Sequence, residues 1–93
     1  MAVAKFLQPA QWWIPLKDSE EERLVRANLR LFIELFLLRF GYGSPRTIEM
    51  NEWEDCGSWG AKFTAATADT NITVKGEISY LPESNSLILS VSA

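Results

Sequence analysis

The stretch that decides the fold is "LRLFIELFLLRF", residues 29–40, in which nine of twelve side chains are large and apolar. Signals for a helix start precede it: Ser19 and Glu22 match the S-x-x-E capping box, in which each side chain bonds a free backbone N–H of the other. Acidic residues at 20–22 suit the positive end of a helix dipole. Because Gly41 is a natural helix terminator, we predict one long helix over residues 19–40.

Beyond Pro45 the apolar period changes from about 3.6 residues to 2, which indicates strands. We expect an antiparallel sheet over residues 46–93, a meander of four strands: "RTIEMNEW", "WGAKFTA", "NITVKGEISYL" and "SLILSVS". The links "ATADTN" and "LPESNS" have hairpin-like length and composition. Alternation fails near Glu52 and Trp53, where we expect a bulge or a strand end. Gly76 falls on the apolar face, and we expect it to make room for a large neighbouring side chain, such as a helix phenylalanine.

These elements predict a two-layer α+β fold of one domain, residues 1–93, because an apolar sheet face must be covered and the helix is the only long element available. Residues 1–17 contain Pro9 and Pro15, which exclude a long helix, so this segment is expected to be irregular or extended. Alternatively, this N-terminal segment adds an edge strand to the sheet. A helix followed by a four-stranded meander resembles the cystatin-like shape, in which a sheet wraps one helix; the resemblance is one of topology alone, without a protease-inhibitor motif.

At 100° per residue, the helix has more apolar surface than one sheet can cover. One arc is expected to lie on the sheet: Val25, Leu29, Phe32, Ile33, Phe36 and Phe40. Leu37 falls in a second, charged arc with Arg26 and Arg30. A third arc, which we call the leucine flank, consists of Leu24, Leu31, Leu35 and Leu38.

The leucine flank needs a cover, because exposed apolar patches are costly in water. The cover is either a strongly curled sheet, the N-terminal Trp12 and Trp13 folded back over the leucines, or a second chain. A helix lying on a membrane is a fourth interpretation, although such helices usually carry a broader basic face. We predict that the leucine flank, with Trp12 and Trp13, binds a protein partner or a second copy in a homodimer.

Composition narrows the functional classes. The 93 residues carry a net charge of -3, which disfavours nucleic-acid binding, since phosphate recognition needs clustered positive charge. The apolar run is too short to span a bilayer, and Glu34 and Arg39 interrupt it. Cys56 is the only cysteine, and the opening residues lack the continuous apolar region of a secretion signal, so we expect a reducing, cytoplasmic location.

The sequence predicts no catalytic residue, cofactor or metal. Histidine, the commonest general base and metal ligand, does not occur, and one cysteine cannot build a structural zinc site. The densest polar cluster is "EMNEWEDCGSW", residues 49–59. A cation site, a carboxylate pair and a reactive Cys56 thiol are possible readings of it. We favour a solvated strand edge with a turn at "DCGS", whose charges discourage pairing with another sheet.

Two functions compete. The first is a small non-catalytic protein–protein interaction or assembly module. The alternative is a carrier of a small ligand, held between helix and sheet in a pocket lined by Trp59, Phe63, Tyr80 and Tyr42. An enzyme is the least supported, because no nucleophile and base can be paired.

Overall fold

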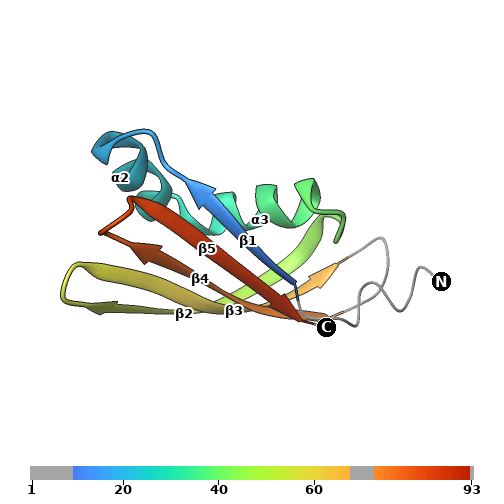
Figure 1. Cartoon of the computed structure of the whole chain (residues 1–93). Coiled ribbons are helices and arrows are strands. Elements are labelled where there is room, and N and C mark those ends of the chain that lie inside the picture. The colour runs from blue at the N-terminus through green and yellow to red at the C-terminus, as the bar shows by residue number, and fades with distance from the viewer. Residues whose placement is uncertain (1–9, 68–72, 93) are drawn as a thin grey trace.

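The computed structural model describes residues 10–67 and 73–92, which form a layer of helices on one face of an antiparallel sheet (Figure 1). The elements in chain order are β1 (Ala10–Pro15), α2 (Ser19–Ala27), α3 (Leu29–Arg39), β2 (Pro45–Asp55), β3 (Ser58–Thr67), β4 (Thr73–Leu81) and β5 (Ser86–Ser92). The small α+β fold predicted from the sequence is thereby confirmed in outline. The number of strands and the continuity of the helix differ.

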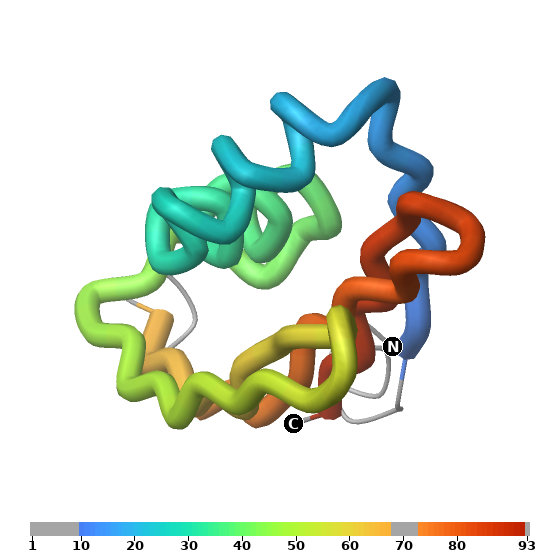
Figure 2. The backbone as a smooth tube through the Cα atoms, turned by 90° about the vertical axis from the view of Figure 1, so that its left-hand side faces the viewer, coloured from blue at the N-terminus to red at the C-terminus, as the bar shows by residue number. Residues whose placement is uncertain are grey.

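The sheet has five strands, in the order β1-β5-β4-β3-β2, and not four. The predicted meander forms β2 to β5, and the N-terminal segment adds β1 antiparallel to β5, with Trp12 opposite Leu89. Pro15 closes this edge strand, a place where a missing backbone N–H is tolerated. Seen end-on, the sheet curves, with β5 and β1 rising beside the helices (Figure 2).

The single long helix is wrong: Asn28 divides it into α2 and α3. The φ and ψ of Asn28 are −124° and 40°, outside the helical region. Its side-chain Nδ2 donates to the Leu24 carbonyl oxygen at 2.9 Å. Asparagine side chains compete for backbone groups in this way, which is why they interrupt helices.

The predicted cap is shifted by one residue. The N-cap is Asp18, whose carboxylate accepts a hydrogen bond from the Glu21 backbone N–H at 2.9 Å. Glu21 Oε1 in turn accepts from the Lys17 backbone N–H at 3.2 Å. Ser19 is therefore the first helical residue, and Glu22 is left to contact the sheet.

The core lies between the helices and the inner sheet face. From the helices it takes Val25, Leu29, Ile33 and Leu37, all 4% exposed or less. Leu37 was predicted in the charged arc, and this is wrong. Leu37 follows Ile33 by four residues within α3, so it lies only about 40° away from Ile33 on the same buried face.

The inner face of the sheet follows the predicted alternation. Trp59, Ala61, Phe63 and Ala65 of β3 are buried, as are Leu87, Leu89 and Val91 of β5. The added Cβ of an alanine at position 76 would lie 2.6 Å from the Phe63 ring, so this glycine makes room for a neighbouring strand's phenylalanine and not for one from the helix. Residues 68–72, which include most of "ATADTN" and Ile72, lie outside the described residues.

The expected irregularity near Glu52 and Trp53 is also wrong. Pairing of β2 with β3 is continuous from Thr47 to Asp55, and its register shifts instead between Pro45 and Thr47. The apolar alternation fails because the inner-face positions 52 and 54 are glutamates near the end of the strand, where Glu54 faces Arg26 of α2. Trp53 lies on the outer face, where its Nε1 donates to Glu77 Oε2 at 3.1 Å. The "DCGS" turn is present: Cys56 and Gly57, with φ of 49° and 89°, join β2 to β3. Two successive positive φ values are typical of a type I′ hairpin turn.

Candidate interaction surface

The leucine flank lies on the outside of the helix layer. Leu24 of α2 and Leu31, Leu35 and Leu38 of α3 are between 48% and 57% exposed. They are four of the five large apolar side chains that are exposed among residues 10–67 and 73–92. Ile33 and Leu37 on the same helix are fully buried, so α3 is apolar on the core side and on the solvent side alike.

The spacing of the leucines explains this placement. Steps of four and three residues keep Leu31, Leu35 and Leu38 along one side of α3, since each step is close to one helical turn. At 100° per residue that side is opposite Ile33, which points at the sheet. Neither the curved sheet nor another described segment buries these leucines.

The two N-terminal tryptophans point to opposite faces of β1. Trp12 faces inward, where its ring stacks on Phe40 with centroids 4.2 Å apart and meets Tyr42 edge-on at 5.9 Å. Trp13 is 65% exposed on the opposite face. The alternation of a strand separates neighbouring residues in this way.

The N-terminal segment therefore covers the phenylalanine side of α3 and not the leucines. A groove of about 350 Å³ between β1 and α3 is lined by Trp12, Trp13, Ile14, Pro15, Phe36, Arg39 and Phe40. None of the four leucines lines it. The structure thus keeps the leucine flank together and places the two tryptophans beside a separate groove.

A charged cluster connects α2 to strands β2 and β3 of the sheet. The Arg26 guanidinium donates to the Glu54 carboxylate at 2.6 Å and lies 5.7 Å from the centroid of the Trp59 ring. Trp59 Nε1 donates to Glu22 Oε2 at 2.8 Å. The hydrogen bond to Glu54 raises the pKa of Arg26, so its positive charge is kept. The sequence alone did not reveal this cluster, because its members are far apart along the chain.

The four aromatic residues expected to line a ligand pocket are core residues. Trp59, Phe63, Tyr80 and Tyr42 are at most 9% exposed, and the Trp59 and Tyr80 rings stack with centroids 5.3 Å apart. Burial raises the pKa of both tyrosines, so both phenols stay neutral near pH 7. These side chains fill the space between the layers.

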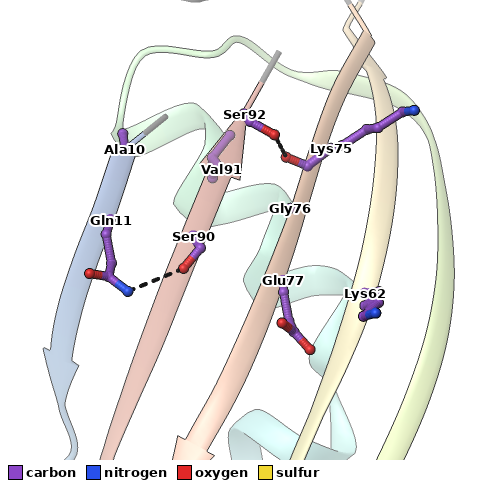
Figure 3. A pocket seen from close by; sticks show the side chains of 9 residues that line it. All are labelled: Ala10, Gln11, Lys62, Lys75, Gly76, Glu77, Ser90, Val91 and Ser92. Carbon is purple, nitrogen blue, oxygen red and sulfur yellow. Dashed lines mark hydrogen bonds between the residues drawn. The ribbon is translucent and has the colours of Figure 1, made fainter. Parts of the chain in front are cut away.

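A hollow of about 620 Å³ lies instead on the outer sheet face, opposite the helices (Figure 3). Lys62, Lys75 and Glu77 surround it, and Gln11 Nε2 donates to Ser90 Oγ at 3.4 Å at one side. Charges of both signs line an open surface here, which gives no selective binding chemistry that we can name.

The acidic cluster of residues 49–59 is divided by its own strand. Glu49 points to the outer face of β2, while Glu54 points to the helix side. Within the described part of the chain, no group of three or more cysteine, aspartate or glutamate side chains lies close enough together to hold a metal ion. Cys56 is exposed at the hairpin tip, and β2 is an edge strand, as the interpretation of a charged edge requires.

Comparison with known proteins gives no assignment: no family model, no curated protein and no solved structure matches the chain. Among residues 10–67 and 73–92 there is no helix with the length and apolar character needed to span a membrane.

Proposed function

We propose that this chain is a small non-catalytic interaction module, acting in the cytoplasm, whose leucine flank contacts another protein chain, either a second copy or a different partner. The observation that supports the proposal is the exposure of four leucines on the outside of the helix layer, three of them in one row along α3. In a monomer, exposed leucines of this kind lower solubility, whereas in a complex they are buried at the interface.

The free energy available is sufficient for a contact. Full burial of a leucine stabilises by roughly 1.5–3 kcal/mol, and about half of each flank leucine is still exposed. Covering the remainder therefore contributes roughly 0.7–1.5 kcal/mol per leucine, or about 3–6 kcal/mol for the row. Association itself costs at least about 4 kcal/mol, so the leucines support a weak contact by themselves and a firm one with further contacts around them.

The alternative of a small-ligand carrier has less support. Its pocket required an opening between helix and sheet, but the aromatic side chains that would line it are buried in the core, where Trp59 and Tyr80 stack on each other. An enzyme has no named nucleophile or base, as the sequence already indicated.

The test compares three tagged chains used as bait in the cells that make the protein: wild type, Leu35→Glu and Lys62→Gln. Both variants lower the net charge by one; Leu35 lies on the flank, and Lys62 lies on the outer sheet face. We expect Leu35→Glu to remain folded by circular dichroism and to lose its bound chains, while Lys62→Gln retains them. Equal capture by all three baits would refute the proposal.

A further inference from the structure

The spacing of the leucine flank is that of a coiled-coil seam. Leu24, Leu31, Leu35 and Leu38 are separated by seven, four and three residues. In a heptad written a to g, the three leucines of α3, Leu31, Leu35 and Leu38, take positions d, a and d. The seam lies on α3, which holds Leu31, Leu35 and Leu38; Leu24 belongs to α2, which runs at an angle to α3 beyond the break at Asn28 (Figure 2).

The charges beside the seam are complementary to those of a second copy. Glu34 precedes Leu35 and so takes position g, and Arg39 follows Leu38 at position e. In a parallel pair of helices, a g side chain meets the e side chain five residues further along in the partner, and these pairs set orientation. Glu34 and Arg39 are five residues apart. In a parallel dimer, Glu34 of each copy would therefore meet Arg39 of the other copy, which gives two equivalent ion pairs related by the twofold axis.

An antiparallel pair brings the same charges into conflict. Its g positions face each other, as do its e positions, so Glu34 would meet Glu34 and Arg39 would meet Arg39. Within residues 10–67 and 73–92 the one ion pair joins Arg26 to Glu54, so Glu34 and Arg39 have no ionic partner in the described part of their own chain. Both are available for pairing with another molecule.

We infer that the occupant of the leucine flank is a second copy of this chain, with the two α3 helices packed parallel and in register about a twofold axis. This inference rests on the proposed function and makes it specific. The seam lies on the side of α3 opposite Ile33, so each sheet lies on the outside of the dimer. Because α3 has only 11 residues, we expect a micromolar or weaker dissociation constant.

Disulfide trapping tests the register. Leu31→Cys and Leu38→Cys are made separately in a Cys56→Ser background, which removes the exposed native thiol. The two sites are about 10 Å apart along the helix axis. Parallel helices in register bring each new cysteine beside its own copy, so both variants should form covalent dimers under mild oxidation. Antiparallel helices can do this at one site at most. Arg30→Cys, on an exposed position outside the seam, is the control that should stay monomeric.

Charge reversal tests the orientation independently. Glu34→Arg or Arg39→Glu alone places like charges opposite each other twice, and we expect each to weaken the dimer roughly three- to tenfold in sedimentation experiments at low salt. The double variant restores opposite charges and should return to wild-type affinity. In an antiparallel dimer the single variants would not be weaker than wild type, which would overturn the parallel arrangement.

Failure of this inference is distinguishable from failure of the proposed function. A chain that stays monomeric at high concentration, yet captures a different protein in a Leu35-dependent way, overturns the second copy and leaves the interaction module standing. A monomer whose captured proteins do not depend on Leu35 overturns both. Covalent dimers at both seam positions, together with rescue by the double charge reversal, support the parallel dimer.

Discussion

Leu37 and Leu38, two adjacent leucines of α3, provide a direct test of which side of this helix packs in the core. Leu37 is fully buried, whereas Leu38 is 57% exposed. Truncation of each to alanine removes the same atoms from the same helix. Any difference between Leu37→Ala and Leu38→Ala therefore reports the surroundings of the two side chains and not helix propensity.

The structure predicts a large difference. Leu37→Ala leaves a cavity in the core and should lower the free energy of unfolding by about 2–5 kcal/mol. For a domain of this size each kcal/mol lowers Tm by about 4–8 °C, so a fall of at least about 8 °C is expected. Leu38→Ala removes three carbons that are less than half buried, and at about 0.8 kcal/mol per buried carbon the loss is about 1 kcal/mol.

Urea unfolding followed by circular dichroism measures both values, at a protein concentration low enough for self-association to be negligible. Ile33→Ala serves as a second core reference, because Ile33 is also fully buried. If Leu38→Ala were as destabilising as Leu37→Ala at this concentration, the leucine flank would be covered by its own chain. The proposed interaction surface would then have no basis.

Gly76→Ala should lower stability by about 1–3 kcal/mol, because the added Cβ would lie 2.5 Å from a β5 carbonyl oxygen and 2.6 Å from the Phe63 ring; an unchanged urea midpoint would contradict this close packing. Asp18→Ala should cost about 1 kcal/mol by removing the N-cap, whereas Ser19→Ala should cost little, and the reverse order would restore Ser19 as the cap. Burial, followed by a nearby carboxylate, raises the pKa of Tyr80 above its usual 10.0. The unfolded chain then loses this proton first, so the contribution of Tyr80 to stability is constant below about pH 10 and falls above it. Tyr80→Phe should make that alkaline fall shallower, as measured by urea midpoints across pH.

Much of the fold followed from local patterns. The inner faces of β3 and β5 and the turn at Cys56 and Gly57 were predicted correctly, because alternation and turn chemistry are properties of neighbouring residues. The break at Asn28 was missed, since asparagine is only mildly unfavourable inside a helix and the choice between continuing and breaking depends on packing. The position of Leu37 was wrong for another reason: Leu37 lies four residues after Ile33 and so on the same side of α3, but it was grouped with Arg26 and Arg30 at the edge of the neighbouring arc.

The candidate site was predicted in part. The leucines were grouped correctly on one side of the helix, and the structure leaves them exposed. Trp12 and Trp13 were grouped with them, but adjacent residues of a strand point to opposite faces, and β1 directs Trp12 to Phe40. The contacts of Arg26 with Glu54 and Trp59 had no local signal, because 28 residues separate Arg26 from Glu54.

The sequence by itself determined which residues are apolar and with what period they recur, and hence the two-layer α+β architecture and the surplus of leucines on the helix. Only the tertiary structure decided which apolar side is buried, because one sheet covers one side of α3 and both sides are almost equally apolar. The sheet buries Ile33 and Leu37, the N-terminal strand pairs with β5 and partly covers the phenylalanine side through Trp12 on Phe40, and the leucine side is left to solvent.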